Sequence, residues 1–272
     1  MVLIAENFNS SITQIAQALE SKDCDTIRQL AEKLDKSRAD YIDVNAGVFH
    51  DTEADKLLFL IAQIRQVSQK PLVIDSPDPR TVARAACFAD SLSPVKPHDQ
   101  PHKPHLLLNS ITLAARRYQP MLETALRYKA GLIALLMDEN GMTASPEKRL
   151  RLADTLITRL TNAGIPEHHL FIDPMITPVA TDDQAGQKAL RMLSSLRQAF
   201  PNCHLAAGLS NISYGLPARR WLNRAFLLQA MAAGLDSPIL NPLDDDLMHL
   251  YAAGLVLLGK DEWCMDYLNR HR

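Results

Sequence analysis

Carboxylate and carboxamide side chains close the short apolar runs of this sequence. They are Glu6, Asn7, Asp43, Asn45, Asp75, Asn109, Asp138, Asp173, Asn211 and Asn241. Carboxylates accept hydrogen bonds, and carboxamides both donate and accept them. Such a set suits a flat, neutral heterocycle. A 2-amino-4-oxo-pyrimidine ring fits well, because its N3–H and 2-amino group can donate two parallel hydrogen bonds to one carboxylate. The alternative is that Asp and Asn only cap turns and helices at these positions.

Other chemistries lack the residues that they need. No lysine closes an apolar run, which argues against a Schiff-base aldolase. No H-x-H pair closes the first run, which argues against a metallohydrolase barrel. No glycine run follows the last two apolar runs, so the phosphate site common in barrels is not indicated. The 4 cysteines are far apart, which argues against a zinc ribbon, a redox motif or a disulfide scaffold.

Three charged clusters allow more than one interpretation. His98, His102 and His105 could bind a metal, but they lie in or beside the proline-rich segment Ser93–Pro104, which we interpret as a loop. Asp244, Asp245 and Asp246 could bind a cation, but negative charge also favours a helix start, and we prefer the helix cap. Arg219, Arg220 and Arg224 could contact an anionic partner or substrate group, or simply be exposed; both interpretations stay open.

The elements that position the polar residues are predicted from the apolar pattern. Each apolar run is short and nearly continuous, as in a parallel strand covered on both faces. The predicted strands are Leu3–Phe8, Tyr41–Asn45, Leu72–Asp75, His105–Asn109, Leu132–Asp138, Leu170–Asp173, His204–Leu209 and Pro238–Asn241.

Helical patterns follow every predicted strand. The predicted helices are Ser11–Glu20, Asp25–Lys36, Ala54–Ser68, Pro79–Ala89, Ala114–Ala130, Pro146–Ala163, Ala185–Phe200, Asn223–Ala233, Asp245–Leu258 and Glu262–Asn269. Eight strand–helix units predict an α/β fold, a (β/α)8 TIM barrel with residues 1–272 in a single domain. A doubly wound sheet would need a glycine-rich first turn, whereas the segment here reads ENFNSS. Barrel active sites lie at the carboxyl ends of the strands, so the polar residues should converge there.

Charge and hydropathy limit the partners. The formal net charge is −2 with no basic stripe, so we expect no nucleic-acid ligand. The most apolar later stretch, Leu247–Leu258, is too short to span a bilayer, so we expect no membrane association. The N-terminal segment MVLIAENFNSS has no basic region and no long apolar stretch, so we expect no signal peptide and a cytoplasmic protein.

Several motifs, in order and at strand ends, resemble a known family. They are ENFNSS, YIDVNAG, LVIDSPDP, LLLNSIT, LMDENGMTASPEKRL, LFIDPMI, AAGLSNIS and NRAFLLQAMAAGLDSPILNPLDDDLM. The chain resembles the pterin-binding methyltransferases, which are barrel proteins akin to dihydropteroate synthase and to the folate domain of cobalamin-dependent methionine synthase. The resemblance covers nearly the whole chain and is closest to methyltetrahydrofolate:corrinoid protein methyltransferases.

The resemblance implies a reaction of one-carbon metabolism. A methyl group moves between N5 of tetrahydrofolate and the cobalt of a corrinoid, so tetrahydrofolate or methyltetrahydrofolate is a substrate. The corrinoid belongs to a separate partner protein, and we expect no metal bound by this chain itself. The resemblance also implies a homodimer.

The resemblance also assigns residues. Asp75, Asn109 and Asp173 match pterin-binding positions, with Asp173 taking the N3–H and 2-amino edge. Asn211 matches the residue that hydrogen-bonds N5 of the methyl donor, a catalytic role. Further candidates for the same pocket are Glu6, Asn7, Asn45, Asp138, Gly208 and Ser210.

Two alternatives remain. A dihydropteroate synthase-like condensing enzyme would use a lysine near the seventh strand, where this chain reads AAGLSNIS. The basic tail Asn269–Arg272 resembles that family's C-terminal motif, but it follows the last predicted helix, and we interpret it as solvated. The other alternative is a pterin-binding module that has lost catalysis.

Overall fold

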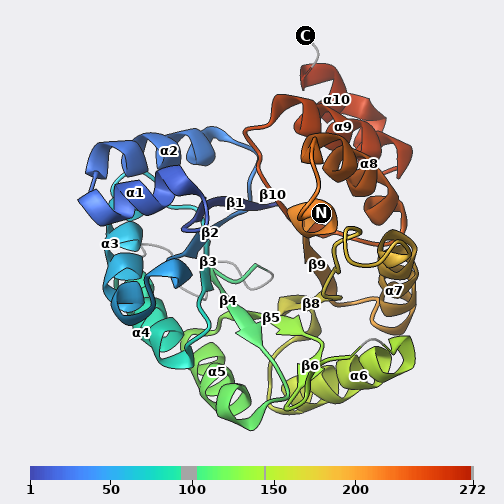
Figure 1. Ribbon diagram of the computed structural model, residues 1–272, viewed down its shortest axis with the longest axis horizontal. Coiled ribbons are helices and arrows are strands. Elements are labelled where there is room, and N and C mark those ends of the chain that lie inside the picture. Colours follow the sequence, from blue (N-terminus) through green and yellow to red (C-terminus); the bar gives the residue numbers. More distant parts are fainter. Residues whose placement is uncertain (93–102, 144, 271–272) are drawn as a thin grey trace.

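The computed structural model describes residues 1–92, 103–143 and 145–270. In this part of the chain, parallel strands form a closed barrel in the order β1-β10-β9-β8-β5-β4-β3-β2, and helices surround it (Figure 1). The predicted (β/α)8 TIM barrel is confirmed. The barrel strands are β1 (Ile4–Asn9), β2 (Tyr41–Asn45), β3 (Leu72–Asp75), β4 (Leu106–Ile111), β5 (Gly131–Leu135), β8 (Leu170–Asp173), β9 (His204–Gly208) and β10 (Ser237–Leu240).

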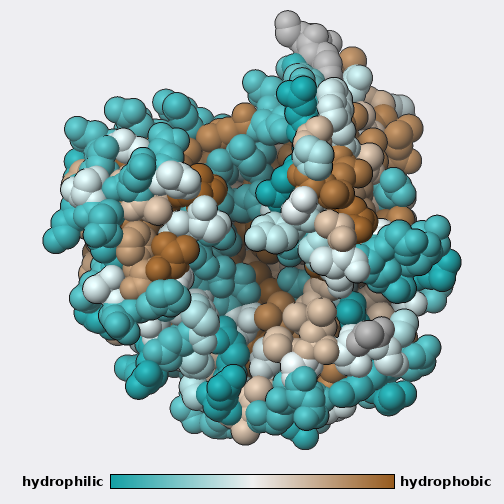
Figure 2. All heavy atoms as spheres, viewed as in Figure 1, coloured by the Kyte–Doolittle hydropathy of each residue, from teal (hydrophilic) through white to brown (hydrophobic). Residues whose placement is uncertain are grey.

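The helices surround the barrel, and all but the last, which has no buried residue, pack apolar side chains toward it. They are α1 (Thr13–Ser21), α2 (Cys24–Lys36), α3 (Glu53–Arg65), α4 (Pro79–Ser91), α5 (Ala115–Tyr128), α6 (Pro146–Asn162), α7 (Ala185–Ala199), α8 (Arg219–Ala232), α9 (Asp245–Leu257) and α10 (Met265–Arg270). Their outer faces make the periphery of the molecule mainly hydrophilic (Figure 2). No helix of the described ranges is long and apolar enough to cross a membrane.

Local sequence explains where several helices begin. The Ser145 side chain accepts a hydrogen bond from Lys148 N at the start of α6, with Pro146 in the first turn. The Asp244 side chain accepts one from Leu247 N at the start of α9. The helix-cap interpretation of the Asp244 cluster is therefore confirmed.

The inside of the barrel changes from apolar to polar along the strands. One buried apolar cluster takes a residue from every strand: Ile4, Tyr41, Val73, Leu107, Ile133, Phe171, Ala206 and Ile239. Strand side chains alternate between faces, so residues two positions later face the interior again. Those residues are Glu6, Asp43, Asp75, Asn109, Leu135, Asp173, Gly208 and Asn241. An apolar layer therefore supports a mainly polar layer at the carboxyl ends.

Several predicted boundaries differ from the structure, and two of these differences lie near the carboxyl ends of the strands. The fifth strand was expected to reach Asp138, but β5 ends at Leu135, and a hairpin follows in which β6 (Met137–Asp138) pairs with β7 (Gly141–Met142). Asp138 accepts a hydrogen bond from Asn140 N in the hairpin turn, which ends the extended run. Helix α8 begins at Arg219 rather than at Asn223, because its first turn is exposed and carries no apolar periodicity.

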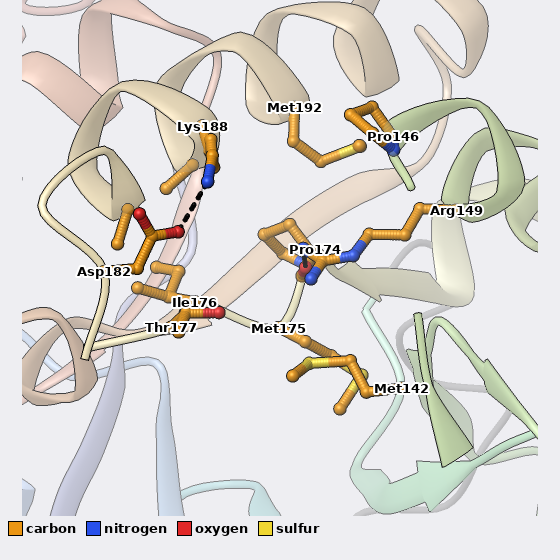
Figure 3. A pocket seen from close by; sticks show the side chains of 12 residues that line it. Met142, Pro146, Arg149, Pro174, Met175, Ile176, Thr177, Asp182, Lys188 and Met192 are labelled. Atoms are coloured by element: carbon orange, nitrogen blue, oxygen red, sulfur yellow. Dashed lines mark hydrogen bonds and ion pairs between the residues drawn. The ribbon is translucent and has the colours of Figure 1, made fainter. Parts of the chain in front are cut away.

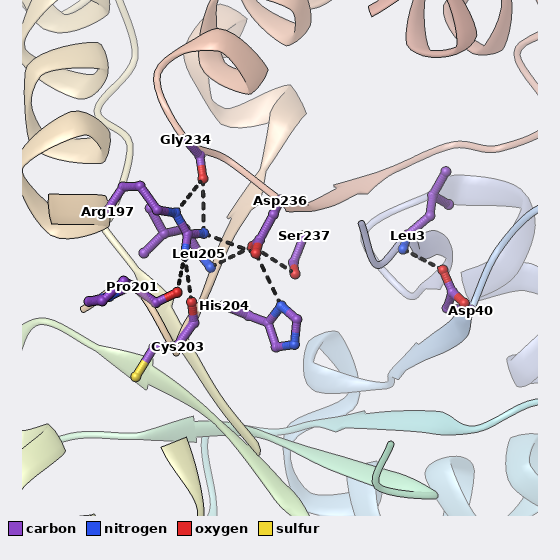
Figure 4. A network of polar contacts seen from close by, with 10 residues as sticks. All are labelled: Leu3, Asp40, Arg197, Pro201, Cys203, His204, Leu205, Gly234, Asp236 and Ser237. Carbon is purple, nitrogen blue, oxygen red and sulfur yellow. Dashed lines mark hydrogen bonds and ion pairs between the residues drawn. The ribbon is translucent and has the colours of Figure 1, made fainter. Parts of the chain in front are cut away.

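Charged groups at the opposite, amino-terminal end of the barrel are paired (Figure 4). Asp236 lies 2.9 Å from Arg197 Nη2, and its Oδ1 accepts a hydrogen bond from Leu205 N at 2.7 Å. The His204 ring lies 3.2 Å from Asp236 Oδ2. Burial raises the pKa of Asp236, but the hydrogen bond and charge of His204, the Leu205 hydrogen bond and the Arg197 charge together lower it below its ordinary value. Nearby, Asp40 accepts a hydrogen bond from Leu3 N at 2.8 Å.

Candidate functional site

A cavity of about 680 Å³ opens at the carboxyl ends of the strands. Its volume is in the range of small-molecule sites, about 300–1,000 Å³. Seven of the ten residues predicted for the site line this cavity: Glu6, Asp75, Asn109, Asp173, Gly208, Ser210 and Asn211. They come from strands far apart in the sequence, and the closed barrel brings them together.

Two of the remaining predicted residues support residues of the cavity. Asn45 Nδ2 donates a hydrogen bond to Asp75 Oδ2 at 2.8 Å, and Asn45 Oδ1 accepts one from Gly47 N. Asn7 Nδ2 donates a hydrogen bond to Asn241 Oδ1 at 2.7 Å, and Asn241 lines the cavity. Asn45 therefore orients Asp75, and Asn7 orients Asn241.

Asp138 lies beside the cavity rather than in it. It lines a neighbouring hollow of about 540 Å³, which shares Asp75 and Asn109 with the polar cavity. Asp138 Oδ2 lies 3.2 Å from Lys148 Nζ, so its charge is paired. The hairpin after β5 carries Asp138 away from the interior layer, which Leu135 occupies instead.

Asp173 combines burial with two opposing influences. Its Oδ1 accepts a hydrogen bond from Met175 N at 2.7 Å. Burial raises its pKa to about 6, against the lowering effects of the Met175 hydrogen bond and the Arg149 charge. The carboxylate is therefore mostly ionised at neutral pH and able to accept hydrogen bonds from a ligand.

Asp75 has a similar balance. Burial raises its pKa to about 6, while the hydrogen bond from Asn45 and the charge of Arg117 oppose the rise. Glu53, a buried carboxyl at the start of α3, raises it further. Two buried carboxylates therefore face one cavity, and both titrate close to pH 6.

Glu6 and Asp43 are two further carboxyl groups of the cavity, and Asp43 is buried. Burial raises the pKa of Glu6 to about 7, although Ser210 Oγ donates a hydrogen bond to its Oε2 at 3.3 Å. Burial, and then the charges of Asp75 and Glu6, raise the pKa of Asp43 well above its ordinary value. Sequence reasoning noted Asp43 at a strand end without assigning it to the pocket. The alternation that points Asn45 inward also points Asp43 inward.

Asn211 lies at the rim, on the turn Leu209–Ser213 that follows β9. Arg219 fixes this turn, since its Nη2 donates a hydrogen bond to Ser210 O at 2.7 Å. A Cβ on Gly208 would lie 3.1 Å from Asn211 Nδ2, so the absence of a side chain there gives the Asn211 amide its room. The amide is therefore held over the cavity by its backbone and remains exposed.

A second cavity of about 330 Å³ lies behind the loop that follows β8 (Figure 3). Its walls are mostly apolar and include Met142, Met175 and Met192. Arg149 also lines it and points toward Pro174, the residue directly after Asp173 (Figure 3). The loop Pro174–Thr177 lines this apolar cavity, and Asp173, directly before the loop, lines the polar one.

The structure offers no metal ligand set within the residues that it describes: no group of three or more His, Cys, Asp or Glu side chains is suitably placed. Of the histidines considered as a metal cluster, His98 and His102 lie outside the described residues. His105 Nε2 lies 3.0 Å from Asp90 Oδ1.

Comparisons with known proteins give a consistent result. Residues 8–241 match the family model described as pterin binding enzyme. A methylcorrinoid:tetrahydrofolate methyltransferase of Eubacterium limosum is 30% identical over 100% of this chain and 96% of its own length. The methionine synthase of Mycobacterium tuberculosis is 32% identical over 46% of this chain, which is 11% of that longer protein.

Solved structures show the same fold. The dihydropteroate synthase of Xanthomonas albilineans, with 4-aminobenzoic acid, has a TM-score of 0.64 at 16% identity, covering 93% of this chain and 92% of that one. The dihydropteroate synthase of Yersinia pestis has a TM-score of 0.59 at 18% identity, with coverages of 96% and 92%.

Proposed function

This chain belongs to the pterin binding enzyme family, and from that premise we propose that it transfers a methyl group between N5 of tetrahydrofolate and the cobalt of a corrinoid carried by a separate protein. The pterin-binding domain of this proposal extends over residues 1–272. The observation that carries it is the polar layer of the barrel, whose carboxylates and amides line one cavity. The full-length similarity to a methylcorrinoid:tetrahydrofolate methyltransferase supports the same reaction.

The carboxylates of the cavity recognise the pterin edge. Asp173 accepts two parallel hydrogen bonds, from N3–H and from the 2-amino group. Its pKa of about 6 leaves it ionised at neutral pH, as this recognition needs. Asp75 and Asn109, which line the same cavity, hold the remaining polar edge of the ring.

Asn211 acts at N5. When the methyl group leaves a tertiary amine, N5 becomes electron-rich and must gain a proton or a strong hydrogen bond. The Asn211 amide donates that hydrogen bond, and the bond strengthens as charge develops in the transition state. Its position on a fixed turn means that little reorganisation is needed at the moment of reaction.

Glu6 supplies or accepts the proton that the reaction moves. A pKa of about 7 gives it both protonation states near neutral pH, which suits a proton donor and acceptor. Ser210 links it to the turn that bears Asn211, because Ser210 Oγ donates to Glu6 Oε2 and precedes Asn211 in the chain. Asp43 lines the same cavity, and the charge of Glu6 helps to raise its pKa.

The partner docks over the mouth. Exposed apolar side chains occur after five of the barrel strands, in loops, in the hairpin after β5 and in the first turn of α8: Ile12, Val48, Met142, Tyr214, Trp221, Leu222 and Leu243. Tyr214 is 68% exposed and Trp221 is 60% exposed, and both lie on the β9–α8 side of the cavity. Exposed apolar side chains near the cavity favour transient docking of a protein that presents its corrinoid to the cavity. The family resemblance also implies a homodimer, which light scattering tests.

Calorimetry and a transfer assay test the proposal. Methyltetrahydrofolate should bind the purified protein, and the protein should accelerate methyl exchange with free cob(I)alamin, followed by the visible absorption of the corrinoid. Binding without turnover, given an active corrinoid partner, would favour a non-catalytic pterin-binding module. Condensation of p-aminobenzoate with a pterin pyrophosphate would favour the dihydropteroate synthase-like alternative, although no lysine lies in Gly208–Asn211.

A further inference from the structure

We propose that Arg149 and Arg117 are positioning residues, which fix the loops after Asp173 and Asp75 and place a positive charge beside these carboxylates. The inference rests on the proposed function, because it assigns the two arginines a part in binding the same pterin. Each comes from a helix that follows a barrel strand, and each donates hydrogen bonds to a loop at the carboxyl end of another strand.

Arg149 joins two loops on one side of the mouth. Its Nη1 donates a hydrogen bond to Pro174 O at 3.1 Å, and its Nε donates one to Thr143 O at 2.8 Å. Pro174 directly follows Asp173, and Met175 N donates to the Asp173 carboxylate. The guanidinium lies against Pro174 (Figure 3) and therefore holds the peptide segment that directly follows Asp173.

Arg117 does the same on the other side. Its Nη2 donates a hydrogen bond to Ser76 O at 2.8 Å, and its Nε donates one to Ser110 O at 2.5 Å. A further hydrogen bond goes to Pro77 O. Ser76 directly follows Asp75, and Ser110 directly follows Asn109, so one guanidinium holds both loops.

The positive charges of these arginines favour the ionised form of the nearby carboxyl groups. Every hydrogen bond shown for the two guanidiniums goes to a backbone carbonyl oxygen rather than to a carboxylate. Burial is the largest influence on Asp173 and raises its pKa; the Arg149 charge opposes it. The Arg117 charge likewise lowers the pKa of Asp75, but Glu53 raises it. The charge of Asp75 also raises the pKa of Asp43. Asp173 with Arg149 is therefore the simpler pair to test.

Arg197 at the amino-terminal end provides a matched control. It also ties loops together through carbonyl oxygens, donating to Gly234 O at 3.0 Å and to Cys203 O at 2.8 Å. Unlike Arg149, it has an acidic partner, Asp236, at 2.9 Å. A purely structural arginine should therefore behave like Arg197.

The test follows tetrahydrofolate affinity by calorimetry between pH 5 and 8. Wild type should lose affinity as the pH falls through about 6, where Asp173 becomes protonated. Arg149→Met removes the charge, so the pH at which affinity is lost should rise by about one unit, and affinity at pH 6.5 should fall about threefold, approaching tenfold near pH 5. Arg149→Lys should leave the pH dependence of affinity unchanged. Arg197→Met should lower thermal stability without changing that pH dependence.

A measurement without ligand separates this inference from the proposed function. The carboxyl resonance of Asp173, assigned by its loss in Asp173→Asn in protein carrying 13C-labelled aspartate, should titrate about one pH unit higher in Arg149→Met. Arg149→Gln should give the same shift if the methionine variant does not fold. An unchanged titration in the folded charge-free variant overturns the inference. Absence of tetrahydrofolate binding by wild type, with the shift present, overturns only the proposed function.

Discussion

The two ends of the barrel hold their carboxyl groups in opposite ways. At the mouth, burial raises the pKa of Asp75 and Asp173 to about 6 and that of Glu6 to about 7. At the amino-terminal end, the base of the barrel, Asp236 is also partly buried, yet its hydrogen bonds and its ion pair with Arg197 lower its pKa. The mouth therefore keeps hydrogen-bonding capacity free for a ligand, whereas the base uses it within the fold.

This contrast predicts opposite pH dependences of stability. For Asp75 and Asp173 the native pKa lies above the ordinary value of 3.8, so their contribution to folding is present below 3.8 and is lost as the pH rises through about 6. For Asp236 the native pKa lies below 3.8, so its contribution is present at neutral pH and is lost as the pH falls below that value. At pH 7 the ionised Asp236 therefore stabilises the fold, whereas the ionised Asp75 and Asp173 destabilise it.

The largest effect should come from the amide at the mouth. Asn211→Ala should slow methyl transfer about 10²–10³-fold, because one transition-state hydrogen-bond donor is lost. The dissociation constant of methyltetrahydrofolate should change much less. Single-turnover kinetics with calorimetry measure both, and equal losses would mean that Asn211 only binds substrate. Asn202→Ala, an exposed carboxamide at the base that donates to Glu167, serves as the control.

At the base of the barrel, removal of the Asp236 charge should change stability and not ligand binding. Asp236→Asn should lower the free energy of unfolding at pH 7 by about 2–3 kcal/mol, because Arg197 and His204 lose an ionised partner. Denaturant unfolding measures the change. Asp182→Asn breaks an ion pair with Lys188, whose side chain is 59% exposed, and should cost far less. Equal losses in the two variants would contradict the assigned role of the base.

The equivalent change at the mouth should act on binding. Asp173→Asn should weaken tetrahydrofolate binding at pH 7.5 about tenfold to a hundredfold, since a neutral amide cannot accept both pterin donors. Asp138→Asn, beside the cavity and paired with Lys148, should weaken binding much less. An unchanged dissociation constant in Asp173→Asn would remove this residue from the site.

The smallest expected effect is a gain in stability. The same Asp173→Asn variant should raise the free energy of unfolding of the ligand-free protein at pH 7 by about 1 kcal/mol, because a buried charge is removed. The gain should vanish below about pH 4, where wild-type Asp173 is already protonated. A loss of stability at pH 7 would mean that the ionised carboxylate supports the loop more than burial opposes it.

Sequence predicted the parts of the site that depend on local pattern. Short apolar runs closed by polar residues gave the strands, and barrel topology then required Asp75, Asn109 and Asp173 to meet. Asp43 lies two residues before Asn45 on the same strand, so the same alternation predicts that its side chain also faces the barrel interior. Asp138 was misplaced because the apolar run continues past Leu135 into the hairpin.

The arginines of the mouth could not be read from sequence. Arg117 contacts Ser76 O from 41 positions away, and Arg149 contacts Pro174 O from 25 positions away. Nothing in the local pattern of α5 or α6 distinguishes these long side chains from exposed arginines on the same helices. Their role depends on the loop geometry that only the folded barrel defines.

A crystal structure of the protein with methyltetrahydrofolate tests the central claim most directly. We predict the pterin ring inside the barrel mouth, with both Asp173 oxygens on its N3–H and 2-amino edge and the Asn211 amide within hydrogen-bonding distance of N5. A folate bound elsewhere, or one whose ring touches neither residue, would contradict the account.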